Sequence, residues 1–303
     1  MLETIVRGHD VMSLSLVVDI AIGGAILGAI YSLIAVGLNL QYGVTRILNV
    51  AHGDFLMLGA YITYFCFTLF GINPFASLAV VGPLIFVIGY LVYIIMLRRA
   101  IKQSKSPEEV ESRSLLLCFG LSFVVQNLAI VMWTANYRGY SAPSFGTINI
   151  AGVLFESNRI LMAIMSIVIN VLLYLYLKFT KTGLAMRATA DHSEGAQIVG
   201  VNVYNVYALS FSLSVVLSAF AGTLISMYST ISPFMGSQYT LIALVLVILA
   251  GIGSFKGNIV GGFIIGYIAY ITLRIIHSAL MLVVIYAVLI IILLVKPRGL
   301  FAR

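Results

Sequence analysis

Side chains that can do chemistry gather inside an otherwise apolar stretch at one place in the sequence, the segment 46–55. It contains the histidine–acid pair His52 and Asp54, with apolar sequence on both sides. Ionisable groups at membrane depth are costly and usually face a cavity or a partner. Glycine at position 53 permits the close approach of another backbone or a break in a helix. Residues 49–54 could therefore form a broken helix that lines a water-filled pathway.

Two interpretations of this segment stay open. In the first, Asn49, His52, Gly53 and Asp54 belong to a translocation pathway, so a Gly53→Leu substitution would block transport with little loss of assembly. In the second, Asn49 caps the helix and Asp54 favours its first turn through the helix dipole. His52 would then lie at the level of the lipid headgroups. An intramembrane enzyme that uses His52 and Asp54 is a more distant alternative.

The segment 182–201 is the most informative polar stretch, within a connection that covers 179–205. Small residues alternate there with basic and acidic positions. Residues 191–199 can form a short helix that starts at Asp191 and stops at Gly200. Such a helix could dock into a cleft of a soluble partner, although the residues alone favour a solvated amphipathic loop.

Several catalytic patterns are absent from the sequence. It has no Gly-x-x-x-x-Gly-Lys-Ser/Thr phosphate loop, no His-Glu-x-x-His and no Gly-x-Ser-x-Gly. We therefore expect no catalytic residues, no cofactor and no metal site, and any ATP hydrolysis must occur on another subunit. Cys66 and Cys118 fall within apolar stretches, where no disulfide is implied.

Composition indicates the elements that position these segments. Of 303 residues, 61% are hydrophobic and 9% are charged, whereas a soluble domain carries roughly 25% charged residues. A membrane span needs about 20 apolar residues. The sequence predicts an all-α integral membrane protein, a polytopic bundle of about nine transmembrane helices in one domain over residues 1–303. The expected spans are 14–40, 49–69, 74–97, 114–134, 160–178, 206–228, 239–255, 258–275 and 278–295.

Two glycine-rich stretches, 23–28 and 257–266, lie within expected spans. Small residues three or four positions apart let helix backbones approach closely in lipid. They predict close helix packing, which supports a bundle without identifying its function.

The distribution of basic residues orients the expected spans. Of the 17 lysines and arginines, thirteen fall on one side of the membrane and four on the other. Positive residues gather on the cytoplasmic side, so the N-terminus is expected outside and the C-terminus in the cytoplasm. The net charge of +7 is explained by this bias, and we expect no nucleic-acid partner. The cytoplasmic group is Arg46, Arg98, Arg99, Lys102, Lys105, Arg113, Lys178, Lys181, Arg187, Lys256, Lys296, Arg298 and Arg303. The outer group is Arg7, Arg138, Arg159 and Arg274.

The chain resembles the LivH-type permeases of branched-chain amino acid ABC importers over nearly its whole length. The resemblance is carried by residues 28–43, 48–61, 182–201 and 249–262, and by the ending 296–301. Its most specific parts are Asn-x-Ala-His-Gly-x-Phe-x-Met-x-Gly-Ala-Tyr, from Asn49, and Gly-Ile-Gly-Ser-x-x-Gly, from Gly251.

This resemblance implies an ABC importer permease fold in the bacterial inner membrane, surrounded by lipid. It implies a heterodimer with a second permease subunit, two cytoplasmic ATP-binding subunits docked on the 182–201 loops, and an extracytoplasmic solute-binding protein. Docking on this loop is expected to involve Gly183, Arg187, Asp191, Glu194, Ala196 and Gly200. Because similar permeases serve urea, short amides and aromatic acids, the solute stays open.

A secondary transporter driven by an ion gradient is the main alternative. It would need no docking loop, and it would more often show several acidic residues inside its spans. Only Asp54 is a candidate here, with Asp19 near an outer edge.

The charge bias generates a topological prediction. Residues 98–113 and 179–205 should be cytoplasmic, and residues 135–159 should lie outside. A cysteine introduced at Phe145 should react with a membrane-impermeant reagent from the outer side. Labelling from the cytoplasmic side alone would contradict the assignment.

Overall fold

The computed structural model describes residues 2–141, 146–251, 253–296 and 299–301. Phe145, the labelling position, lies outside them. Within the described residues, eight helices are long and apolar enough to cross a membrane, and Met235–Ala250 is a shorter apolar helix. The all-α polytopic bundle is confirmed, and the nine expected spans correspond to eight long helices and one short one.

The helices and strands follow one another along the chain as listed here, with three short π- or 3₁₀-helical segments among them. They are α1 Leu2–Thr45, α2 His52–Phe70, α3 Pro74–Val92, η1 Tyr93–Leu97, α4 Arg98–Gln103, α5 Pro107–Trp133, β1 Thr147–Ile150, β2 Val153–Glu156, α6 Ser157–Phe179, α7 Lys181–Asp191, α8 Ser193–Ile198, α9 Val203–Ile225, α10 Met235–Ala250, α11 Phe255–Ile271, η2 Thr272–Ile276, η3 Ser278–Leu280 and α12 Met281–Val295.

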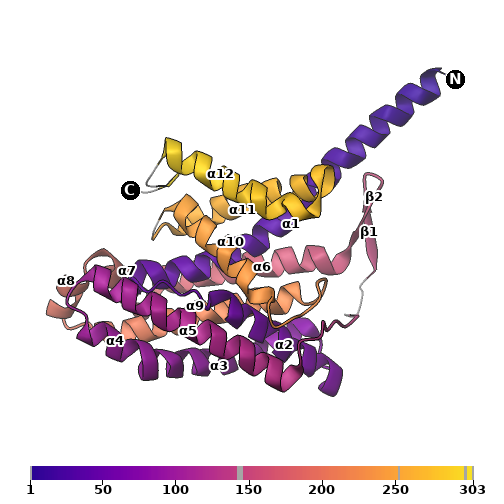
Figure 1. Cartoon of the computed structure of the whole chain (residues 1–303). Helices are drawn as coiled ribbons and strands as arrows, with labels where there is room; N and C mark the ends of the chain where they lie inside the picture. Colours follow the sequence, from indigo (N-terminus) through magenta and orange to yellow (C-terminus); the bar gives the residue numbers. More distant parts are fainter. Residues whose placement is uncertain (1, 142–145, 252, 297–298, 302–303) are drawn as a thin grey trace.

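Two helices, α1 and α9, form the centre of the bundle (Figure 1). Helix α1 packs against α6, α9, α10 and α11, while α9 also packs against α2 and α3. The other long helices expose much of their apolar surface; for example, Val131 of α5 and Leu294 of α12 are 82% and 80% exposed. This pattern is typical of a bundle whose periphery faces lipid.

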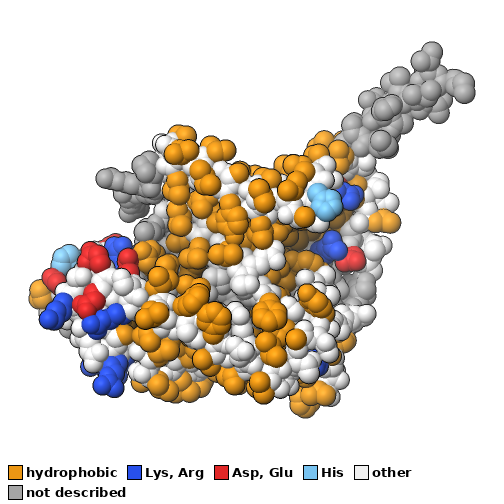
Figure 2. Space-filling view, viewed as in Figure 1, with side chains coloured by type: hydrophobic (Ala, Val, Ile, Leu, Met, Phe, Trp, Pro, Cys, Tyr) orange, Lys and Arg blue, Asp and Glu red, His pale blue; other side chains and the backbone are white. Residues whose placement is uncertain are grey.

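Charged side chains gather at the two ends of the molecule, with apolar side chains between them (Figure 2). We call one the α7–α8 end, which comprises α4, α7, α8 and the start of α5. The other is the hairpin end, which comprises the antiparallel pair β1–β2, the start of α6 and η2.

The glycine-rich stretches pack closely, as the sequence predicts. A Cβ atom on Gly266 would lie 2.4 Å from the Cα of Gly28, and one on Gly262 would lie 2.6 Å from the Cα of Ser32. These contacts join α11 to α1 at a distance that no larger side chain permits.

Asn39 of α1 holds the tight turn between α10 and α11. Its Nδ2 donates to the carbonyl oxygen of Gly251 at 3.2 Å, and its Oδ1 accepts from the Gly253 N–H at 2.7 Å. Both glycines have positive φ, 85° and 77°. The Gly-Ile-Gly-Ser string is therefore needed for backbone geometry at this turn.

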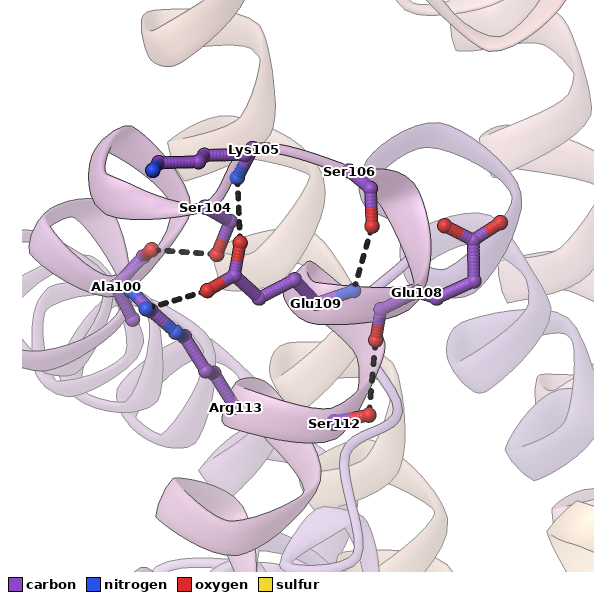
Figure 3. Close-up of polar contacts among 8 residues, drawn as sticks. All are labelled: Ala100, Ser104, Lys105, Ser106, Glu108, Glu109, Ser112 and Arg113. Carbon is purple, nitrogen blue, oxygen red and sulfur yellow. Dashed lines mark hydrogen bonds and ion pairs between the residues drawn. The ribbon is translucent and has the colours of Figure 1, made fainter.

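Residues 98–113 are more ordered than a loop. Helix α4 and the first turn of α5 meet there in a capped turn (Figure 3). The Ser106 hydroxyl accepts from the Glu109 N–H at 3.3 Å, and the Glu109 carboxylate accepts from the Lys105 N–H at 2.6 Å while pairing with Arg113. Ser106 thus caps the helix N-terminus, and the Glu109 carboxylate binds the N–H of the residue before the cap.

Candidate functional site

The polar segment around His52 lies where the chain leaves α1 and enters α2. Residues 46–51 are not helical, and Arg46 has a positive φ of 56°. The helix is therefore interrupted here, but earlier than the predicted 49–54, because His52, Gly53 and Asp54 already belong to α2. Ile47 and Asn49 are nevertheless fully buried, each 0% exposed. The backbone groups of the break must find partners inside the protein.

Side chains from the end of α1 supply these partners. The Gln41 amide donates to the carbonyl oxygen of Ile47 at 3.3 Å and accepts from Asn49 Nδ2 at 3.3 Å. The Thr45 hydroxyl accepts from the Ile47 N–H at 3.2 Å. These bonds replace the water that would solvate such a segment in a soluble loop.

Helix α2 begins deep within the bundle. The His52 ring lies with Nε2 3.2 Å from the carbonyl oxygen of Ile34 in α1. Ile34 precedes the end of α1 at Thr45 by eleven residues. A helical rise of 1.5 Å per residue puts this contact about 16 Å from that end. His52 therefore lies well inside the helix bundle, far from the end of α1.

The first turn of α2 touches the first turn of α10. The Gly53 N–H donates to the Thr240 hydroxyl at 2.8 Å. A Cβ atom on Gly53 would lie 1.9 Å from the carbonyl oxygen of Gly236. Because that oxygen belongs to the backbone, a leucine at position 53 would force the two helices apart. The expectation that Gly53→Leu leaves assembly intact is therefore wrong.

From this contact the two helices run in opposite directions. Near the end of α2, the Phe67 ring lies 4.9 Å from the ring of Tyr140, which precedes the β1–β2 hairpin in the chain, and the two rings are tilted by 33°. Helix α10 continues toward the turn that Asn39 holds. Its 16 residues span about 24 Å, less than the roughly 30 Å of a hydrocarbon core. Two helix N-termini thus meet in the middle of the bundle.

Helix α9 closes the site from a third side. The Ser218 hydroxyl donates to the carbonyl oxygen of His52 at 2.6 Å. Since His52 Nε2 faces a carbonyl oxygen, it carries the proton, and Nδ1 is left with a free lone pair. Within the described part of the chain, His52 Nδ1 and Asn49 Oδ1 have no hydrogen-bond partner.

Asp54 is held from α5. Its Oδ1 accepts from Gln126 Nε2 at 2.9 Å, and Gln126 also donates to the Ser122 hydroxyl at 3.0 Å. The carboxylate is 1% exposed, and among the described residues its Oδ2 has no partner.

The structure separates the two interpretations of this segment in part. Ala51, and not Asn49, is the N-cap of α2, and it makes no side-chain cap bond. Capping by Asn49 is therefore wrong, whereas Asp54 does lie in the first turn. A pathway role for Asn49, His52, Gly53 and Asp54 stays a prediction, because all four are buried in this conformation.

The connection 179–205 folds into two short helices at the α7–α8 end. Gly183 lets α7 fold back on α6, since a Cβ there would lie 2.5 Å from the Cα of Leu177. The expected helix 191–199 is wrong in its bounds: Asp191 ends α7, and α8 covers Ser193–Ile198. His192 interrupts the two helices because its Nδ1 accepts from the Gly195 N–H at 2.8 Å.

The predicted docking residues divide by exposure. Arg187, Asp191, Glu194 and Gly200 are exposed, whereas Gly183 and Ala196 are buried. The stop at Gly200 is confirmed by its φ of 89°.

Sequence reasoning missed the apolar tip of α8. Ile198 and Val199 are 86% and 78% exposed, although they lie at an end where charged side chains gather. Two adjacent β-branched residues before a helix-stopping glycine were the available signal. Gln126, Ser218 and Thr240 were also missed, because their partners are distant in the sequence. Gln41 was missed although its partners Ile47 and Asn49 lie only six and eight residues away.

Comparison with known proteins gives a consistent result. The family profile described as branched-chain amino acid transport system / permease component matches residues 20–293. The chain is 28% identical to the branched-chain amino acid permease protein BraD of Pseudomonas aeruginosa, over 93% of this chain and 94% of that protein. It is 28% identical to LivH of Escherichia coli, over 92% and 94%, and 31% identical to a probable LivH of Methanocaldococcus jannaschii, over 80% and 77%. No solved structure matches.

The contact between α2 and α10 generates a prediction. Thr240→Val keeps the side-chain shape but leaves the Gly53 N–H without an acceptor, which should lower the free energy of unfolding by about 1–3 kcal/mol. Unfolding of the purified protein by a denaturing detergent measures this loss. Thr68→Val is the matched control, because the exposed Thr68 hydroxyl bonds only within its own helix. Equal stability of the two variants would count against the contact.

Proposed function

The chain belongs to the family of permease components of branched-chain amino acid transport systems, and we propose that it carries such amino acids, or a related small solute, into the cell at the expense of ATP. The observation that supports this proposal best is the extent of the similarity. Relatives with permease names match more than nine-tenths of this chain and of their own length. A match confined to one helix pair would have indicated only a shared membrane architecture.

We place this multi-pass protein in the bacterial inner membrane with the α7–α8 end in the cytoplasm. Lys102, Lys105 and Arg113 lie on or beside α4 and α5, and Lys181 and Arg187 lie on α7. This concentration at one end supports the orientation through the positive-inside rule. The N-terminus then lies outside and the C-terminus in the cytoplasm.

Four partners complete the proposed machine: a second permease subunit, two ATP-binding subunits and an extracytoplasmic solute-binding protein. Helix α8 is the proposed contact for an ATP-binding subunit. Ile198 and Val199 form an apolar tip, with the charged Glu194 exposed on the same short helix. An apolar centre with a polar rim is typical of protein interfaces.

The helices that pack against α8 are arranged so that they could transmit a movement of α8 to the rest of the bundle. Helix α7 is capped by Thr180, whose hydroxyl accepts from the Gly183 N–H at 3.0 Å, and Gly183 seats α7 directly on the end of α6. Lys102 of α4 also lies over the Tyr204 ring of α9, 5.0 Å from its centre. Helix α8 itself contacts α7 and α9, and α7 contacts α6, so a push on α8 would reach α6 and α9 through short, packed connections.

We also retain the proposal that Asn49, His52, Gly53 and Asp54 belong to the translocation pathway. Two observations support this proposal. The N-termini of α2 and α10 meet deep in the bundle, and polar atoms without partners lie beside them. Transporters use such an arrangement at solute sites. Because these residues are buried here, the α2–α10 contact would have to open in another conformation.

Transport in proteoliposomes tests the function. We expect the complex of this chain with its partner permease, ATP-binding subunits and solute-binding protein to accumulate radiolabelled leucine only when ATP is supplied. Vanadate should abolish this uptake. Leucine uptake driven by a sodium or proton gradient without ATP would instead support a secondary transporter.

A charge on the apolar tip tests the docking proposal. Ile198→Asp should lower the amount of ATP-binding subunit that co-purifies with the permease by about tenfold, because a desolvated carboxylate opposes an apolar contact. Leu154→Asp is the control, since Leu154 is equally apolar and 67% exposed but lies on β2 at the hairpin end. Undiminished co-purification of the Ile198 variant would contradict docking at α8.

A further inference from the structure

A pocket lies at the α7–α8 end, with walls from α1, α6, α7 and α11. It has an inner part of about 290 Å³ and an outer part of about 600 Å³. Neither the apolar tip of α8 nor residues 49–54 line it. The two parts are continuous, because they share the lining residues Gly43, Tyr174, Arg187, Ala190, Gly253 and Phe255.

The inner part is mainly apolar and reaches well into the bundle. Val36, the deepest of its α1 residues, precedes the end of that helix at Thr45 by nine residues, which corresponds to about 14 Å along the helix axis. Asn39, which also lines it, already binds the α10–α11 turn through both amide atoms. A lining of this kind favours a hydrocarbon chain over a polar solute. Its aliphatic residues are Val36, Leu40, Val44, Leu177 and Met186.

The outer part has an excess of positive charge. Arg46 follows α1, Arg187 lies on α7, and Lys256 lies in the first turn of α11. All three are exposed, and Asp191 is the acidic residue in this lining. Arg187 donates to the carbonyl oxygen of Lys178 at 3.4 Å, which leaves its charge unbalanced. Since the ion pairs of the described residues all lie elsewhere, the three cations are available to an anion from outside the chain.

The N-terminus of α11 adds to this positive field. Its first two residues, Phe255 and Lys256, both line the outer part. The Ser254 hydroxyl caps the turn by accepting from the Gly257 N–H at 3.1 Å. The partial positive charge of the helix start therefore acts at the same place as the cationic side chains.

Two aromatic rings lie where the apolar and basic parts meet. The Tyr174 ring of α6 is 5.7 Å from the Phe255 ring of α11, and both residues line both parts. The Lys178 ammonium lies 5.8 Å from the centre of the Tyr174 ring. Tyrosine beside lysine is typical of the level at which hydrocarbon gives way to headgroups. The change of polarity inside the pocket thus matches the boundary of a bilayer.

We propose that this pocket binds an anionic phospholipid from the leaflet on the α7–α8 side. Its phosphate would lie among Arg46, Arg187 and Lys256, and one acyl chain would enter the inner part. Basic pockets between transmembrane helices bind anionic headgroups in other membrane proteins. A free phosphate would leave the apolar part unused, and an acidic segment of a soluble partner would have to enter hydrocarbon.

A lipid in this position would contact α1, α6, α7 and α11 together. It would therefore support α7, which packs on both α6 and α8. The proposal does not depend on the transport function, because lipid binding is measured without solute and without ATP.

Titration of the complete transporter complex in detergent with a fluorescent lipid tests the headgroup contacts by fluorescence anisotropy. Phosphatidylglycerol that carries a nitrobenzoxadiazole label should bind about tenfold more tightly than phosphatidylcholine with the same label. The double variant Arg46→Gln/Lys256→Gln should weaken phosphatidylglycerol binding by about thirtyfold, because two of the three cations are lost. Arg99→Gln/Lys105→Gln is the matched control and should bind as tightly as the unmodified chain. Both of its residues are exposed at the same end and line neither part of the pocket.

Three other results would overturn the proposal. Equal affinity for the two lipids, or an equal loss in the two double variants, would show that no specific headgroup contact exists. Displacement of phosphatidylglycerol by inorganic phosphate would assign the basic residues to a free anion. Loss of the ATP-binding subunit from Arg46→Gln/Lys256→Gln, with lipid binding unchanged, would assign them to the protein partner.

The position of the acyl chain gives a second readout that needs no substitution. Phosphatidylglycerol with a diazirine near the end of one acyl chain should, on irradiation, attach to residues 36–44 of α1 and 173–178 of α6. Phosphatidylcholine with the same group should instead label the exposed apolar surfaces of α5 and α12. The same labelling pattern for both lipids would overturn the proposed site.

Discussion

In the hydrocarbon of a membrane, every backbone N–H and C=O group must find its partner within the protein. Continuous helices meet this demand by themselves, and most of this chain does so. The informative places are those where helix is interrupted at depth. At residues 46–51 the side chains of Gln41 and Thr45 supply the missing bonds, and at the α10–α11 turn a single asparagine, Asn39, supplies two. The polar side chains of α1 therefore complete the backbone hydrogen bonding at both interruptions.

The glycines act together with these polar side chains, because they leave room for two helix backbones to come into contact. Helices α2 and α10 meet at Gly53 and Gly236, and α2 and α9 meet where a Cβ on Gly222 would lie 1.9 Å from the carbonyl oxygen of Leu56. Without side chains in between, a neighbouring hydroxyl such as Thr240 can reach a backbone N–H across the contact. Close approach and hydrogen-bond satisfaction depend on each other here, because widening the contact would remove both.

Much of the architecture was predictable from sequence because a helix that crosses lipid must consist mainly of apolar residues. The apolar runs predicted the helices, and the spaced glycines predicted the packing of α11 on α1. An interruption near α2 was also predictable from the polar residues in this apolar stretch, but its position was not, since Gly53 lies within α2 and the non-helical residues are 46–51. What could not be predicted was set by distant partners: Gln126 on Asp54, Ser218 on His52, and Asn170 on Ser32. The bounds of α8 were missed for a local reason, because His192 caps the helix in place of Asp191.

Because α2 is synthesised before α10, the contact between them can form only late in biogenesis. Domains and segments nearer the N-terminus emerge first, so α2 enters the membrane long before Thr240 has been synthesised. Until then the Gly53 N–H has no acceptor from α10, and the space that Gly236 will occupy is open. Helix α10 is too short to cross the bilayer in a stable way by itself. When α10 packs against α2, Thr240 provides the acceptor for the Gly53 N–H, and the same contact buries α10 away from lipid. The last third of the chain therefore completes a contact that the first third cannot make during biogenesis.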